Sequence, residues 1–357
     1  MAVINLKHSY AKTIEKRFAH DSVTESCFSK ELDVEFHGVK SVTVSHNGVA
    51  PVNDYVRSGD NRFGTVNELD DYEQEFVMTQ DKSSTWSIDK GNQAEQYNQK
   101  QAGQTLKEQM RQVYTPMIDK YRIQRWADGA GKVIGLTAAP TKSNIIEKML
   151  DMDLAMDDVG VPEEGRFFYV PTTYYKLFLL SDEFQKADAL LIKALGKKTV
   201  GTLFGKVAVK CVPPSWMPAD VYLMEVYKGA AISPVKLQTL RILTEQRGID
   251  GDVVEMRFIY DAFVRGTKAE GISLSVASSK AVAAPTVTFA ANVATMASTT
   301  SGATIVYTTD GGDPRYSKHA LVYDGESKPT IAAGATVRAA AKKTGMFQSS
   351  VTEAKNA

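Results

Sequence analysis

Cysteine is nearly missing from this chain. Cys27 and Cys211 are its only two cysteines, and they lie far apart in sequence. Two such residues cannot form a disulfide framework or a cysteine-based zinc site, so a reducing compartment is expected. We interpret both as buried, unreactive thiols, because free cysteine behaves as a small apolar side chain.

The chain also lacks net charge and long apolar runs. Lysine plus arginine and aspartate plus glutamate each number 42, so no overall field draws it to nucleic acid, anionic lipid or an acidic substrate. No apolar run reaches the roughly 18 residues of a membrane-spanning helix, and the N-terminal residues are too polar for a signal peptide. A length of 357 residues predicts roughly two domains, made and kept in a cytoplasm.

Motifs for catalysis are missing as well. The five histidines include no pair at i, i+4 spacing, and there is no GxSxG, no phosphate-binding glycine loop and no HExxH. Glu163 and Glu164 are adjacent, so on a strand they would point to opposite faces. Asp310 and Asp313 resemble a calcium loop but lack EF-hand spacing, which favours a turn. The sequence therefore predicts no enzyme, no cofactor and no metal site.

A long helix is the most regular feature that the sequence contains. It is expected from about Gln96 to Asp128, a length of roughly 45 Å, either as a spine for several sheets or as a coiled-coil arm. The heptad-like spacing is too short for a coiled coil, which favours the spine. Pro116 predicts a kink or a break into two helices. The apolar residues that recur on one face of this helix, and are expected to pack, are Leu106, Met110, Val113, Met117 and Tyr121.

Strands separated by a long polar loop precede this helix. The segment before them is too poor in apolar residues to bury a core of its own, so it reads as an arm that lies on another surface. The loop, residues 47–64, is long enough to be either functional or disordered, and function is favoured because apolar residues occur in it. The residues at its tip that are predicted to contact a neighbouring subunit are Tyr55, Val56, Arg57, Arg62 and Phe63.

An α/β pattern follows the helix. One helix carries a stripe of apolar residues that we interpret as core rather than as a binding groove, namely Ile145, Met149, Met152 and Met156. The clearest strand of the chain is expected at residues 252–264. We expect this strand to pack against the long helix. The residues on its buried face are predicted to be Val254, Met256, Phe258 and Tyr260.

The composition changes after Gly271. Small residues at 275–284 predict a linker, and the rest reads as an independent β-sandwich with turns rich in glycine, aspartate and proline. Its expected strands lie at Thr286–Phe289, Thr304–Thr308, Ala320–Tyr323, Thr336–Ala341 and Ser349–Thr352.

Several stretches, in this order, resemble the major capsid proteins of tailed bacteriophages, which have the Hong Kong 97 phage-type fold. They are FVMTQDKSSTWSIDKGN, EQMRQVYTPMIDKYRIQRWA, GRFFYVPTTYYKLF and VVEMRFIYDAFVRGTKAEGI. The resemblance covers about residues 1–272 and implies an α+β fold. The implied parts are an N-terminal arm (1–38), an extended β-hairpin loop (39–91), a peripheral domain with the spine helix (92–142 and 244–274) and an axial domain (143–243).

The resemblance also implies a function. It predicts a non-enzymatic subunit that forms pentamers and hexamers of an icosahedral or prolate virion shell, assembled in the host cytoplasm around double-stranded DNA that it does not bind specifically. A portal is implied, with a separate scaffolding protein or none, because the chain begins directly at the arm. One family member joins its subunits covalently through a lysine of the extended loop, but residues 47–64 here contain arginines and no lysine. A non-covalent shell is therefore expected.

The C-terminal part resembles a second family. The stretches IVYTTDGGDPRYSKHALVYDGE and ATVRAAAKKTGMFQSSV are similar to the immunoglobulin-like domains at the C-terminus of chitobiase and hexosaminidase-type enzymes. The resemblance implies an all-β immunoglobulin-like domain at 285–357, exposed on the particle surface. It leaves open whether that domain contacts glycans weakly or only stabilises the surface. Three other functions are alternatives: an encapsulin-like compartment around an enzyme cargo, a carbohydrate-binding surface module, and a carbohydrate-active enzyme with an accessory sandwich, which the missing carboxylate pair disfavours.

Overall fold

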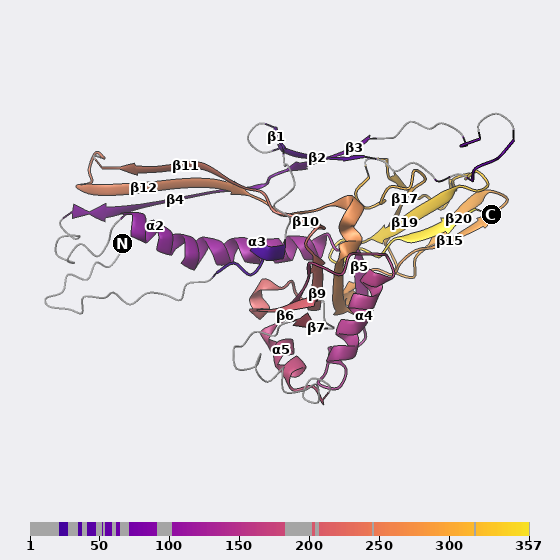
Figure 1. Cartoon of the computed structure of the whole chain (residues 1–357), viewed down its shortest axis with the longest axis horizontal. Coiled ribbons are helices and arrows are strands. Elements are labelled where there is room, and N and C mark those ends of the chain that lie inside the picture. The colour runs from indigo at the N-terminus through magenta and orange to yellow at the C-terminus, as the bar shows by residue number, and fades with distance from the viewer. Residues whose placement is uncertain are drawn as a thin grey trace. The chain divides into compact units, whose positions relative to one another are not determined.

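The computed structural model describes residues 21–27, 35–37, 41–47, 52, 54–58, 62–64, 71–90, 102–182, 202–203, 207–244, 246–317 and 319–356 (Figure 1). The chain divides into two compact units. Unit 1 comprises Met1–Lys30, Gly91–Ser233 and Ala262–Ala357, and unit 2 comprises Glu31–Lys90 and Pro234–Asp261. Among the described residues, no helix has both the length and the apolar character needed to cross a lipid bilayer.

A six-stranded mixed sheet is the centre of unit 1. Its strand order is β5-β14-β9-β6-β8-β7, with β14 parallel to β5 and β8 parallel to β6, and the other pairs antiparallel. The sheet therefore joins segments that lie between residues 132 and 277. The strands are β5 (Lys132–Leu136), β14 (Ile272–Ala277), β9 (Val221–Tyr227), β6 (Arg166–Pro171), β8 (Val207–Val212) and β7 (Thr202–Leu203).

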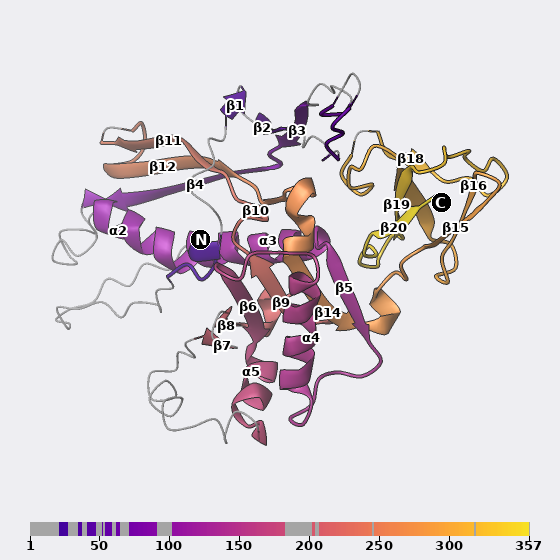
Figure 2. The ribbon, with the colours of Figure 1, turned by 45° about the vertical axis from the view of Figure 1, so that its right-hand side comes forward.

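Alternate side chains of this sheet enter two separate cores. On one face, Phe168 and Val170 pack with α4 (Ile145–Asp157) and α5 (Thr172–Leu179), and α4 lies against β14 and β9 (Figure 2). On the other face, Tyr169 packs with the long helix. A strand buried on both faces reads as a continuous apolar run, as GRFFYVP does. The predicted stripe on α4 is confirmed as core, because Ile145, Met149, Met152 and Met156 are each fully buried.

The long helix continues through Pro116 with a change of helix type. It consists of α2 (Ala102–Gln109), a π-helical segment η2 (Met110–Tyr114) and α3 (Thr115–Asp128), and residues 96–101 of the expected helix lie outside the described ones. The Thr115 amide donates to the Met110 carbonyl, five residues earlier. Proline has no N–H and its ring crowds the preceding turn, so a widened turn directly before Pro116 relieves that clash.

The strand expected at 252–264 is divided in two. In unit 2, β12 (Gly251–Tyr260) lies between β11 (Val235–Leu243) and β4 (Gln80–Asp89), all antiparallel, and the predicted residues of its apolar face are 0–4% exposed. The strand ends at Asp261, whose buried carboxylate accepts hydrogen bonds from the Thr79 amide (2.7 Å) and hydroxyl (2.9 Å).

The other three-stranded sheet of unit 2 consists of β1 (Glu35–His37), β2 (Ser41–Asn47) and β3 (Asp71–Val77).

Residues beyond 262 return to unit 1. There β13 (Phe263–Val264) pairs with β10 (Ala231–Ile232). Ser275–Ala277, expected in the linker, belong to the central strand β14 instead, and the connection shortens to a 3₁₀ turn, η5 (Ser278–Lys280), and a few further residues. Small residues suit a linker, but they equally suit a strand that is buried on both faces.

The C-terminal part forms two small sheets around a core of its own. One sheet is β15 (Thr286–Ala290) with β16 (Val293–Ala297), and β16 was not predicted from the sequence. A two-residue turn joins these strands, with positive φ at Ala291 (46°) and Asn292 (65°), and it lacks the glycine that signals such turns. The other sheet, in spatial order, is β18 (Leu321–Val322), β17 (Thr304–Thr308), β19 (Thr336–Lys342) and β20 (Thr352–Lys355).

A buried polar layer lies between α4 and the central sheet. The Arg166 guanidinium pairs with Asp153 (2.6 Å) and Asp157 (2.7 Å), and its side chain has no exposed area. Glu225, on β9, is fully buried and lies opposite Ser273 of β14 in the strand register. Burial raises the pKa of Glu225 to about 9, and the nearby Asp153 charge raises it further than Arg166 lowers it. The carboxyl group is therefore neutral at pH 7.

This layer makes stability depend on pH. Between the ordinary Glu225 pKa of 4.5 and its folded value of about 9, the folded chain holds a proton that the unfolded chain releases. The free energy of unfolding should therefore fall as pH rises through this window, by up to about 1.4 kcal/mol per pH unit. Urea unfolding of Glu225→Gln from pH 5 to 9 should show a flatter profile than the original chain. Exposed Glu164→Gln is the control, and equal slopes for all three chains would contradict the assignment.

Candidate functional site

The described part of the extended loop carries an apolar patch that is open to solvent. Tyr55, Val56 and Phe63 are 54%, 54% and 83% exposed. The Val56 amide donates to the Arg62 carbonyl (3.0 Å), and the Tyr55 and Phe63 rings meet edge to face at 5.1 Å. The loop thus holds two aromatic rings together at the surface, with Arg57 exposed beside them.

Such a patch favours contact with another surface. Covering a phenylalanine side chain completely stabilises by about 1.5–3 kcal/mol, so this loop gains free energy when something buries it. Adjacent aromatic rings flanked by arginine are typical of residues that contribute most to protein interfaces. The predicted interface residues Tyr55, Val56, Arg57, Arg62 and Phe63 therefore lie in one short part of the loop, and their partner stays a prediction.

The predicted packing stripe of the long helix is exposed at two of its five residues. Met110 and Val113 are 42% and 38% exposed, whereas Leu106, Met117 and Tyr121 are partly buried. The fully buried side is a different one and consists of Tyr114, Asp119, Arg122, Ile123, Trp126 and Ala127. The apolar pattern does not identify this side because two of its members are charged. The expected packing of the stripe on the sheet of unit 2 remains a prediction.

Asp119 anchors the N-terminal segment to the helix. Its carboxylate accepts hydrogen bonds from the Ser22 hydroxyl (2.8 Å), the Val23 amide (2.9 Å) and the Thr24 hydroxyl (2.5 Å). Arg122, one helical turn later, lies 3.6 Å from Asp119 and donates to the Thr24 hydroxyl (3.0 Å). Because buried carboxylates need hydrogen-bond donors, Asp119 and the chain at 22–24 hold each other in place.

Further contacts hold the end of this segment. The Lys210 ammonium (2.6 Å) and the Tyr169 hydroxyl (3.3 Å) both donate to the Val23 carbonyl. Cys27 is fully buried as predicted, and burial raises the pKa of its thiol to about 12. Cys211 is exposed, and its prediction as a buried residue was wrong. The sequence around this strand, KVAVKCV, does not reveal which of its side chains are covered.

The four carboxylates that the sequence analysis examined as possible acid/base or calcium-binding groups lie in turns and loops. Glu163 and Glu164 lie exposed in a turn, not on a strand. Asp310 accepts a hydrogen bond from the Gly312 amide (2.9 Å), and Asp313 forms an ion pair with Arg315 (2.5 Å). Among the residues that the structure describes, no group of three His, Cys, Asp or Glu side chains could hold a metal ion.

Solved structures that are similar to this chain include phage capsids. "Capsid structure of the Cyanophage P-SCSP1u" is similar with a TM-score of 0.58 at 12% identity, covering 76% of this chain and 92% of that one. "The capsid of Myoviridae Phage XM1" gives 0.51 at 15% identity, covering 78% and 98%. A structure from Mycobacterium phage Che8 gives 0.56 at 16% identity, covering 77% and 98%. The predicted phage capsid fold is therefore confirmed.

A family model matches the C-terminal domain. The model of the chitobiase/beta-hexosaminidase C-terminal domain matches residues 282–353, which confirms the immunoglobulin-like prediction for this part. A search of curated proteins found no match.

The N-terminal anchor leads to a prediction. Asp119→Ala removes the acceptor of three donors and leaves Arg122 buried without its carboxylate, so the free energy of unfolding should fall by about 3–5 kcal/mol. Urea unfolding of the unassembled chain measures this. The control is Asp21→Ala, which removes only the exposed ion pair with Arg111 and should cost no more than about 1 kcal/mol. Equal losses for the two variants would refute the anchor.

Proposed function

We propose that this protein is the major capsid protein of a tailed bacteriophage and builds the head shell from pentamers and hexamers. The observation that carries the proposal is the fold, which is shared over about three quarters of the chain with solved phage capsids, including those of P-SCSP1u and XM1.

The exposed apolar groups fit a subunit that is completed by its neighbours. The free chain leaves Tyr55, Val56 and Phe63 in water on the loop, and Met110 and Val113 in water on the helix. In a shell, the loop gains a partner surface from another copy. The loop then contributes to assembly rather than to the fold of a single chain, so the particle should resist unfolding more than the free subunit does.

The charge balance fits a container for DNA. With 42 basic and 42 acidic residues, the wall offers no overall attraction to phosphate, and so it encloses a genome without specific binding. In this proposal the protein is made in the host cytoplasm and resides in the virion, and a portal and a separate scaffolding protein act during assembly. The immunoglobulin-like domain lies on the outer surface, where weak glycan contact is one use.

The alternatives have less support. An encapsulin-like compartment would share the fold, but the similar structures described above come from phages. A carbohydrate-binding module accounts only for residues 282–353 and leaves the rest of the chain without a role.

Electron microscopy of the expressed protein tests the role of the loop. Phe63→Asp places a charge in the aromatic patch and should abolish closed shells, leaving capsomers or single chains, because a buried unpaired carboxylate is costly. Ser58→Asp is the matched control, since it adds the same charge to an exposed position of the same loop and should still form shells. Normal shells from Phe63→Asp would exclude the patch as an assembly contact.

A denaturing gel tests the non-covalent shell. Purified particles should run as a single band of about 39 kDa, the 39.1 kDa mass of the chain. The reason is that residues 47–64 include no lysine. Towards the stem, Lys82 on β4 is exposed, and Lys90, just after β4, pairs with Asp250 (3.6 Å). A ladder of covalent oligomers under reducing conditions would contradict this.

A further inference from the structure

The C-terminal domain is held against the body of unit 1, although the sequence predicted an independent module. Its entry is held on both sides, because the Phe347 amide donates to the Lys280 carbonyl (2.8 Å) and the Val282 amide donates to the Phe347 carbonyl (3.0 Å). Ala281 and Phe347 also form a parallel bridge. Only a short stretch of chain is therefore left to act as a hinge.

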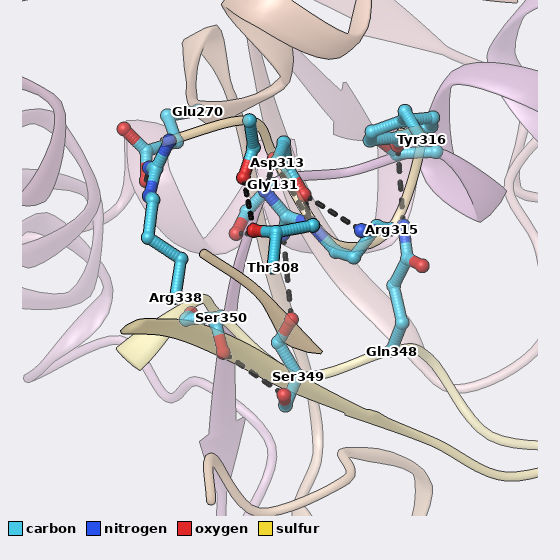
Figure 3. A network of polar contacts seen from close by, with 12 residues as sticks. Gly131, Glu270, Thr308, Asp313, Arg315, Tyr316, Arg338, Gln348, Ser349 and Ser350 are labelled. Carbon is cyan, nitrogen blue, oxygen red and sulfur yellow. Dashed lines mark hydrogen bonds and ion pairs between the residues drawn. The ribbon is translucent and has the colours of Figure 1, made fainter. Parts of the chain in front are cut away.

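A second attachment is formed by the loop Asp313–Tyr316, far from this entry in sequence. The Arg315 guanidinium donates to the Gly131 carbonyl (2.7 Å; Figure 3). The Tyr316 hydroxyl donates to the Gly129 carbonyl. Gly129 and Gly131 belong to the turn that joins α3 to β5. Gln348 supports the same contact from within the domain, since its amide nitrogen lies 3.2 Å from the Tyr316 hydroxyl oxygen.

The charged group in this contact is almost completely buried. The side chains of Arg315 and Asp313 are 1% and 7% exposed, and their ion pair measures 2.5 Å. Burial alone would lower the pKa of Arg315, but the hydrogen bonds and the charge of Asp313 outweigh it, and the pKa lies above its ordinary value. Arg315 also donates to the Ser349 carbonyl (3.3 Å), so the guanidinium links two parts of the domain to the body.

The body has a matching recess for the tyrosine. A Cβ atom placed on Gly266 would lie 2.8 Å from the Tyr316 Cβ, and one on Gly129 would lie 3.4 Å from its hydroxyl oxygen. Real Cβ atoms essentially never approach other heavy atoms closer than 3.0 Å. The tyrosine can therefore lie in this position because position 266 has no side chain.

We propose that the loop Asp313–Tyr316 is an intramolecular clamp, by which the immunoglobulin-like domain fixes the end of the spine helix and the start of β5. The clamp satisfies two carbonyl groups just beyond the helix end, where backbone acceptors lack intrahelical partners. It also places a buried cation close to that end, where the helix dipole favours positive charge. The domain is thus a structural brace of its own subunit, a role that does not depend on shell formation or on any glycan.

Hydrogen exchange tests the clamp from both sides of the contact. Gly266→Ala changes only the body and pushes Tyr316 away, whereas Tyr316→Phe removes only the hydroxyl on the domain. Amides of residues 125–133 should exchange roughly tenfold faster in both variants, because one charged or buried hydrogen bond contributes about that factor. The amides of β17 and β19 should keep their protection. Gly325→Ala is the control, since its Cβ would meet no atom within 4 Å.

The outcomes separate a clamp from a simple packing defect. Faster exchange at 125–133 in both variants supports the clamp. Faster exchange in Gly266→Ala alone would assign the effect to the body and overturn the proposal, as would unchanged exchange in both. If Gly266→Ala fails to fold, Arg315→Lys replaces it, since lysine keeps the charge but cannot hold Asp313, Gly131 and Ser349 together. Unchanged exchange at 125–133 in Arg315→Lys would likewise overturn the proposal.

Discussion

Charged groups buried against helix α3 are the constraint on which unit 1 depends. Asp119 and Arg122 lie on the closed side of the helix, where an unpaired charge would cost several kcal/mol. Their partners come from the N-terminal segment, and the buried Arg315 at the other end comes from the C-terminal domain. One helix therefore holds together parts of the chain that are almost 300 residues apart. The geometry of these contacts is specific, since a carboxylate or guanidinium is satisfied only by donors or acceptors in the right places.

The central sheet is also held by buried side chains, but most of these are apolar and only a few are charged. Its two faces are mostly apolar, and alternate residues such as Phe168 and Tyr169 enter different cores. Beneath α4 a polar layer interrupts the packing, and there Glu225 stays neutral while Arg166 is paired twice. Glu225 can be buried because it keeps its proton, and Arg166 can be buried because it forms ion pairs. Both are ways in which proteins bury ionisable groups.

At the surface of the chain, several large apolar side chains are exposed to solvent. Aromatic and aliphatic groups of the extended loop and the long helix stay in water, whereas charges elsewhere are buried at considerable cost. A free chain gains nothing from exposed Phe63, but the proposed shell would, because every copy could cover the same group of its neighbour. The exposed loop residues thus fit the proposed role of a subunit that is completed by association.

The sequence by itself determined the order of the parts, the buried methionine stripe of α4 and the apolar face of β12, because period and composition report which side chains avoid water. It also identified the exposed residues of the loop tip. Tertiary structure alone decided which side of the long helix is buried, where β12 ends at Asp261, that Cys211 is exposed and that the C-terminal domain is clamped rather than tethered. The buried helix side, the strand end and the clamp each depend on a partner far away in sequence, and the local pattern carries no information about a hydrogen bond or ion pair formed across such a distance.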